Sequence, residues 1–185
     1  MQQLHPDVER ILADEKQIDE ITTRLAKTIT KDYQNSGRDL VFVVILKGSI
    51  FFATDLIRKV PLDCNIEFMK VSSYGAGTTT SGFIQVHVDL KRDVKDADVI
   101  LVEDIIDSGR TLEKLSHLLA NRGAHSVKCC TLLDKPERRQ VPLKADYTGM
   151  EIPDEFVVGY GLDYNERYRN LPYVGILKRS VYASE

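Results

Sequence analysis

Continuous apolar runs alternate along the chain with segments in which apolar residues recur every three or four positions. Residues 40–46 and 99–102 are continuously apolar, as is typical of strands buried on both faces of a sheet. Residues 84–90 alternate apolar and polar side chains, which predicts a half-exposed strand. Further strands are predicted over residues 66–71, 127–133 and 156–158.

The segments with helical spacing lie outside these strands. The first helix is predicted to begin after a capping box formed by Asp14 and Gln17, and Gly37 can close it. Two more helices are predicted over residues 49–59 and 111–122. Apolar residues at helical spacing mark the buried face of the first helix: Ile18, Ile21, Leu25 and Ile29.

Strands that alternate with helices predict an α/β fold with a mainly parallel sheet and right-handed crossovers. A chain of 185 residues, without repeats or a Pro/Ser-rich linker, is expected to form a single domain over residues 1–185. In an open parallel sheet, ligands bind beyond the carboxyl ends of the strands. Those ends are predicted at Lys47, residues 103–110, residues 134–135 and from Gly159 onward.

Composition narrows the expected partners and location. The chain has 25 basic and 28 acidic residues, a net charge of -3, so no broad basic surface is expected for nucleic acid. No apolar run approaches the roughly 20 residues of a membrane helix, and residues 1–7 lack the apolar core of a secretory signal. Cys64, Cys129 and Cys130 are expected to be reduced thiols. We therefore predict a cytoplasmic protein with neither a nucleic-acid partner nor a membrane partner.

Residues 99–111, Val-Ile-Leu-Val-Glu-Asp-Ile-Ile-Asp-Ser-Gly-Arg-Thr, join a buried strand to a helix start through an acidic turn. Gly109 lets the backbone approach a ligand closely, and Ser108 and Thr111 can each donate a hydroxyl hydrogen bond. The first turn of the helix presents unpaired N–H groups and the positive end of its dipole. Together these groups predict a phosphate-binding turn, although neither the Walker nor the Rossmann glycine spacing is present.

Three carboxylates share this turn: Glu103, Asp104 and Asp107. Anions beside a phosphate are unfavourable unless a divalent cation or sugar hydroxyls offset them. A ligand that carries a phosphate, a ribose diol and bound magnesium fits all three carboxylates. The alternative is an acidic turn in which Asp107 only caps the following helix.

The string at residues 102–111 resembles the signature of the type I phosphoribosyltransferases, which bind 5-phosphoribosyl 1-pyrophosphate (PRPP). Its Glu-Asp-Ile-Ile-Asp form resembles the hypoxanthine-guanine branch of that family. The resemblance implies a mainly parallel twisted sheet flanked by helices, with a small hood and a flexible active-site loop at residues 73–82. Other matching strings are Leu-Lys-Gly at 46–48, Ser-Tyr at 73–74, Leu-Leu-Asp-Lys at 132–135, Pro-Asp-Glu-Phe-Val-Val-Gly-Tyr at 153–160 and Leu-Asp-Tyr-Asn-Glu at 162–166.

The resemblance also implies roles for individual residues, with Asp107 as the catalytic group that exchanges a proton with the base. The residues implied to bind the ribose 5-phosphate part of PRPP are Glu103, Asp104, Asp107, Ser108, Gly109, Arg110 and Thr111. Those implied to bind pyrophosphate are Lys47, Gly48, Ser73, Tyr74 and Arg169. Those implied to bind the purine are Ile105, Lys135, Phe156, Val157 and Asp163, and those implied to hold Mg²⁺ are Glu103, Asp104 and Asp163.

The chemistry of several side chains supports these assignments. The ammonium of Lys47 can neutralise a pyrophosphate, and in the family the Leu46–Lys47 peptide bond can be cis. The ammonium of Lys135 only donates hydrogen bonds, so it suits the 6-oxo group of hypoxanthine, guanine or xanthine better than the amino group of adenine. Phe156 can stack on the base. Arg138 and Arg139 are expected to be solvated in the charged run that begins at residue 134.

We therefore predict a purine salvage transferase that converts hypoxanthine or guanine and PRPP to IMP or GMP and pyrophosphate, with Mg²⁺. The family resemblance implies a homodimer or homotetramer. Three alternatives remain. The first is a non-catalytic PRPP-sensing regulator of the same fold, and the second is the same chemistry on xanthine or a pyrimidine. The third is a structural α/β domain whose acidic turn is only a helix cap.

Overall fold

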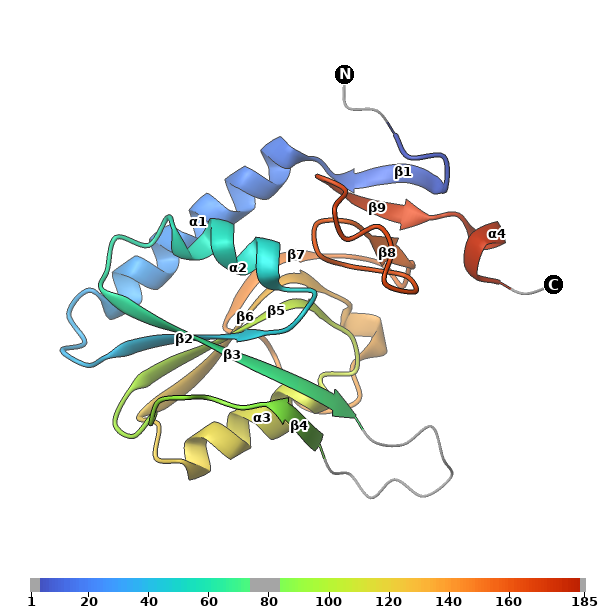
Figure 1. The fold of residues 1–185 in the computed structure, drawn as a ribbon. Coiled ribbons are helices and arrows are strands. Elements are labelled where there is room, and N and C mark those ends of the chain that lie inside the picture. Colours follow the sequence, from blue (N-terminus) through green and yellow to red (C-terminus); the bar gives the residue numbers. More distant parts are fainter. Residues whose placement is uncertain (1–3, 74–83, 184–185) are drawn as a thin grey trace.

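The computed structural model describes residues 4–73 and 84–183, and nearly all of the predicted loop at residues 73–82, including Tyr74, lies outside them. Six strands form the main sheet in the order β4-β3-β2-β5-β6-β7 (Figure 1). Their bounds are β2 Leu40–Ile45, β3 Cys64–Ser73, β4 Ile84–Val88, β5 Asp98–Ile106, β6 Ser126–Asp134 and β7 Tyr147–Glu151.

Five of these strands, β2, β3, β5, β6 and β7, pair in parallel, and β4 pairs with β3 antiparallel at the edge. The prediction of a mainly parallel sheet is therefore confirmed. The apolar run at residues 99–102 lies in β5, and the run at residues 40–46 lies in β2 apart from Leu46, which follows the strand. Both strands have neighbours on both sides, and every residue from Leu40 to Ile45 and from Val99 to Val102 is buried. Strand β5 extends four residues beyond the predicted run, into the acidic segment.

Helices cover both faces of the sheet (Figure 1). Helices α1 (Glu15–Tyr33) and α2 (Ile50–Ile57) pack on one face, where Phe52 lies in the same core cluster as Phe42 of β2. Helix α3 (Arg110–Asn121) packs on the other face, where Leu115 joins Val43 of β2. The continuous apolar runs thus form a central layer of strands, and the segments with helical spacing form a layer of helices on each side of it.

The capping box predicted at the start of α1 is confirmed. The Asp14 carboxylate accepts the Gln17 N–H at 2.8 Å, and the Gln17 side chain accepts the Asp14 N–H at 3.0 Å. Helix α1 ends at Tyr33, so Gly37 does not close it. Gly37, with a φ of +67°, belongs instead to the turn that leads into β2.

A second, antiparallel sheet of three strands in the order β1-β9-β8 forms the predicted hood. It contains β1 (Val8–Ala13), β9 (Val174–Leu177) and β8 (Val157–Val158), and the short helix α4 (Arg179–Tyr182) follows β9. Strands β1, β7 and β9 and helix α4 were not predicted. Over the described residues, no helix combines the length and the apolar character needed to cross a bilayer.

Candidate active site

Strand β5 runs to Ile106, so Glu103 and Asp104 lie in the strand and not in the predicted turn. The turn itself consists of residues 107–109, and α3 begins three residues after Asp107. Gly109 is the N-cap residue of α3, has a left-handed φ of +80°, and caps without any side-chain hydrogen bond. The alternative in which Asp107 merely caps this helix is therefore wrong. The Arg110 N–H makes only a long hydrogen bond of 3.4 Å, to the Ser108 hydroxyl. The first N–H groups of an α-helix have no partner within the helix, so the start of α3 suits an anion.

A cavity of about 340 Å³ lies beyond the carboxyl ends of β2 and β5. It brings together groups of opposite charge from four separate parts of the chain. The predicted site residues that line it are Lys47, Gly48, Glu103, Asp104, Ile105, Asp107, Ser108, Gly109, Thr111, Asp163 and Arg169. Arg110 begins α3 with an exposed side chain and does not line this cavity, and Ser73 is the last residue of β3.

Two glycines allow these strand ends to meet. A Cβ atom on Gly48 would lie 1.8 Å from an Asp104 carboxylate oxygen, so only glycine lets that carboxylate rest against the backbone of residue 48. A Cβ on Gly161, whose φ is +105°, would lie 1.9 Å from the Gly48 carbonyl oxygen. The Leu46–Lys47 peptide bond beside them is cis, as the family resemblance implied.

The two cations of this cavity share an acidic neighbour that sequence reasoning missed. Glu166 accepts hydrogen bonds from Lys47 at 2.9 Å and from Arg169 at 3.3 Å. Both lower the pKa of Glu166, with Lys47 contributing most. Arg169 also pairs with Asp163 at 2.9 Å and donates to the Gly161 carbonyl at 2.7 Å. Glu166 and Asp163 thus hold the pair of cations at one end of the cavity.

A second cavity of about 330 Å³ adjoins the first. Lys135, only 7% exposed, lies at the end of β6, with its Nζ 3.6 Å from carboxylate oxygens of both Asp107 and Asp154. Phe156 also lines the cavity and stacks on Tyr182 at a ring-centroid distance of 4.9 Å. The residues common to both cavities are Asp104, Ile105, Asp107 and Asp163, and Val157 lines only the second.

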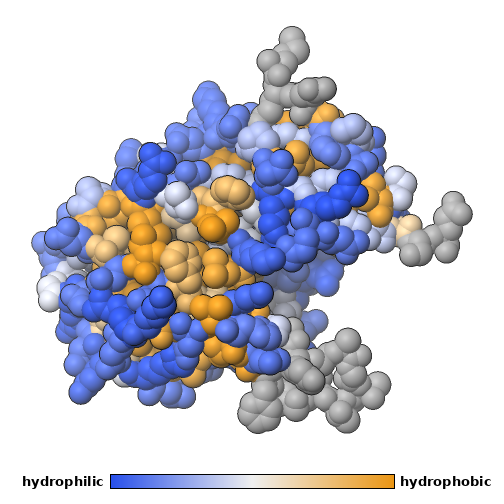
Figure 2. All heavy atoms as spheres, viewed as in Figure 1, coloured by the Kyte–Doolittle hydropathy of each residue, from blue (hydrophilic) through white to orange (hydrophobic). Residues whose placement is uncertain are grey.

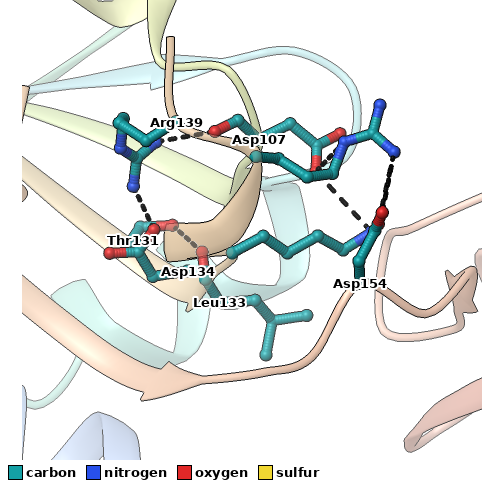
Figure 3. A network of polar contacts seen from close by, with 8 residues as sticks. Asp107, Thr131, Leu133, Asp134, Arg139 and Asp154 are labelled. Carbon is teal, nitrogen blue, oxygen red and sulfur yellow. Dashed lines mark hydrogen bonds and ion pairs between the residues drawn. The ribbon is translucent and has the colours of Figure 1, made fainter. Parts of the chain in front are cut away.

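The charged run after β6 differs from the sequence prediction. Arg138 is half exposed as expected, yet it pairs with Asp154 at 3.2 Å and lines the second cavity. Arg139 was expected to be solvated, but its side chain is only 16% exposed. It contacts the Asp134 carboxylate and the main chain of Asp107 (Figure 3). A run of adjacent charges carries no signal that separates the buried arginine from the exposed one.

A larger cavity of about 560 Å³ lies between α1, α2 and residues 169–172. It shares only Arg169 with the first cavity, and it contains neither the acidic turn nor Lys135. The residues singled out by their chemistry therefore gather in the two smaller cavities.

The carboxylates fit a magnesium ion that is shared with a ligand. Among the described residues, no three His, Cys, Asp or Glu side chains are placed to hold a metal by themselves. Mg²⁺, however, usually takes one or two protein carboxylates and completes its shell with water and substrate phosphate oxygens. Glu103, Asp104 and Asp163 line one cavity and offer the hard oxygen donors that this mode of binding needs.

Burial raises the pKa of Glu103 well above its ordinary value of 4.5, and the adjacent Asp104 carboxylate raises it further. A raised pKa in the folded state means that Glu103 is neutral in the fold at acidic pH. As the pH rises from about 4.5 toward the raised pKa, the unfolded state ionises while the folded state keeps its proton, so the folded state loses stability. Glu103 therefore opposes folding increasingly toward alkaline pH unless a cation offsets its charge.

We expect Glu103→Gln to weaken the pH dependence of stability. In metal-free buffer, the wild type should lose free energy of unfolding relative to the variant as the pH rises above the ordinary glutamate pKa of 4.5, since glutamine cannot ionise. Urea unfolding at several pH values, followed by circular dichroism, measures the difference. Parallel curves for the two proteins would contradict this prediction.

Comparison with known proteins agrees with this geometry. Residues 8–165 match the family model described as the phosphoribosyl transferase domain. The chain is 48% identical to the hypoxanthine-guanine phosphoribosyltransferase of Staphylococcus aureus over 181 residues, which is 98% of this chain and 100% of the relative. It is 49% identical to the bifunctional protein TilS/HprT of Listeria monocytogenes over 97% of this chain and 28% of that protein.

Solved structures give the same result. A crystal structure of hypoxanthine phosphoribosyltransferase from S. aureus matches with a TM-score of 0.93 at 48% identity, covering 97% of each chain. The hypoxanthine phosphoribosyl transferase of Trypanosoma cruzi matches with a TM-score of 0.93 at 39% identity, covering 97% of this chain and 96% of the other. The predicted fold is thereby confirmed. The chain belongs to the phosphoribosyltransferase family.

Proposed function

We propose that this enzyme transfers the 5-phosphoribosyl group of PRPP to hypoxanthine or guanine, which yields IMP or GMP and pyrophosphate. The observation that carries the proposal is the pair of adjoining cavities that share Asp104, Ile105, Asp107 and Asp163. One cavity has an anion-binding turn, two cations and carboxylates. The other has a buried ammonium and an aromatic ring. A transfer between a phosphorylated sugar and a flat base needs two such sites with a common wall.

The sugar donor fits the first cavity. Backbone N–H groups of the turn and the start of α3, with the Ser108 and Thr111 hydroxyls, seat the 5-phosphate. Lys47 and Arg169 bind the pyrophosphate, which takes the place of the Glu166 carboxylate between them. Glu103 and Asp104 face the ribose hydroxyls. Mg²⁺, held by Glu103, Asp104 or Asp163 together with substrate oxygens, supplies charge neutralisation to the pyrophosphate.

The base fits the second cavity. Lys135 donates to the 6-oxo group, and Phe156, whose one face packs on Tyr182, offers the other to the purine. Backbone carbonyls of Val157 and Asp163 accept from a 2-amino group. Because adenine carries an amino group at position 6, it has nothing to accept the Lys135 hydrogen bond.

In the reaction, N9 of the base forms a bond to ribose C1 while the bond from C1 to the pyrophosphate oxygen breaks. The proton on N7 of the base passes to the Asp107 carboxylate, which lines both cavities. Positive charge develops on the sugar, and the carboxylates around it stabilise that charge. Lys47 and Arg169 stabilise the negative charge on the leaving group.

Incubation with PRPP and Mg²⁺ beside each of hypoxanthine, guanine, xanthine and adenine tests the proposal. We expect pyrophosphate release with hypoxanthine or guanine and little with adenine, because adenine cannot accept from Lys135. Omission of Mg²⁺ should abolish release. Binding of PRPP without turnover of any base would favour a PRPP-sensing regulator, and turnover of xanthine alone would move the assignment to that base.

Replacement of the proton acceptor gives a second test. Asp107→Ala should lower kcat by about 100-fold or more and leave the KM for PRPP nearly unchanged, since general acid–base catalysis contributes roughly that much. Asp107→Asn, which keeps the shape but binds no proton, should behave alike. Asp154→Asn, which removes the other carboxylate near Lys135, should alter the KM for the base more than kcat. Near-normal turnover of Asp107→Ala would remove Asp107 from this role.

We also infer that the protein is a cytoplasmic homodimer or homotetramer. Six large apolar side chains are exposed along α2, β3 and β4: Ile50, Phe51, Ile66, Phe68, Val86 and Val88. Figure 2 shows apolar surface gathered over α2 and β3. An apolar face of this kind is typical of a subunit interface. The three free cysteines support a reducing compartment.

Light scattering tests the oligomer. The wild type should have two or four times the chain mass of 21.0 kDa. Phe68→Glu should shift the mass toward one chain, because a buried carboxylate without a partner is unfavourable at an interface. Asn35→Glu, in the turn after α1, adds the same charge elsewhere and should leave the mass unchanged. An unchanged mass for Phe68→Glu would exclude this face.

A further inference from the structure

The turn at residues 107–109 lines the first cavity, where the phosphate is proposed to bind. The carbonyl groups of this turn must point away from an anion. In a planar trans peptide, the C=O and the following N–H point in opposite directions. A partner that holds a carbonyl on the far side therefore aims the next N–H toward the cavity. Two carbonyls of this turn, those of Asp107 and Ser108, have such partners, and both partners come from the segment after β6.

Arg139 and Gln140 supply these contacts. The Arg139 Nη1 donates to the Asp107 carbonyl at 2.8 Å, and the Gln140 N–H donates to the Ser108 carbonyl at 3.0 Å. The peptide planes on either side of Ser108 are thereby fixed, and the N–H groups of Ser108 and Gly109 are fixed with them. A Cβ on Gly109 would lie 3.2 Å from Arg139 Nη1, so the turn also packs closely on the arginine.

The guanidinium is itself anchored to the sheet. Its Nη2 donates to the carboxylate of Asp134, which is 6% exposed and ends β6 (Figure 3). Asp134 pairs in register with Ile106 of β5, and its carbonyl accepts the Ile152 N–H at 2.8 Å. The planar fork of the guanidinium thus bridges a strand end and the turn, with one nitrogen on each.

We propose that Arg139 is a positioning residue for PRPP: it holds the Asp107 peptide so that the amides of the turn face the 5-phosphate. This role rests on the proposed function. Arg139 lines neither the first nor the second cavity, so it acts through the turn and not by contact with a substrate. Lysine, which is a single point donor on a flexible stem, cannot reproduce a bridge with two nitrogens in fixed geometry.

The test is steady-state kinetics of Arg139→Lys. The amides bind the 5-phosphate equally in the ground state and the transition state, so their misalignment should raise the KM for PRPP about tenfold and change kcat and the KM for the base less than about twofold. A merely structural role would reduce the folded fraction, which lowers the apparent kcat and leaves the KM for PRPP unchanged. The KM for PRPP therefore separates the two roles even if the variant is less stable.

Two further variants complete the test. Asp134→Asn keeps the size of the anchor but weakens its hold on Arg139, and it should raise the KM for PRPP in the same direction by a smaller factor. Arg122→Lys breaks a similar bidentate pair, with both contacts to Asp89 at 2.7 Å, at the far end of α3 and should change no kinetic constant. An unchanged KM for PRPP in both site variants, beside an active wild type, overturns the role of Arg139. An inactive wild type would instead overturn the proposed function.

Discussion

The structure is organised around a conflict of charge at the end of β5. The same short segment carries carboxylates and is proposed to bind a phosphate, two properties that oppose each other unless peptide dipoles and cations are placed between them. Parallel pairing brings the ends of β2, β5 and β6 to one edge. Gly48 lets the backbone of residue 48 contact the Asp104 carboxylate, and Gly161 lets residue 161 contact the Gly48 carbonyl. Lys47 and Arg169 then face the carboxylates across a single cavity.

The layers of the fold and the acidic turn could be predicted because their signals are local. A continuous apolar run reports a strand with neighbours on both sides, and β2 and β5 have them. The groups of the proposed phosphate site lie within one short segment, from the end of β5 to the first residues of α3. Lys47 and Lys135 could be placed by the same logic, since each follows a buried strand whose carboxyl end must lie at the ligand-binding edge.

The parts that sequence reasoning missed depend on partners far along the chain. Strand β1 pairs with β9, and its sequence mixes charged and apolar residues because one face of the hood is exposed. Glu166 lies 119 residues from Lys47, so no spacing connects them. Arg138 and Arg139 are adjacent and chemically identical, yet only Arg139 meets a backbone carbonyl and a buried carboxylate. A charge pattern cannot report a contact with the main chain.

The segment from Asp134 to Gln140 links the two halves of the site. Lys135 lines the second cavity. Its backbone N–H donates to the carbonyl of Ile106, one residue before the turn, at 3.0 Å. Arg139 and Gln140 donate hydrogen bonds to two carbonyls of the turn itself. In the proposed function, this one stretch of chain thus sets both the position of the ammonium that recognises the base and the direction of the amides that bind the phosphate. In-line attack tolerates little displacement between its two reactants. Contacts from one segment to both proposed binding sites would therefore keep the base and the sugar at a fixed distance and orientation.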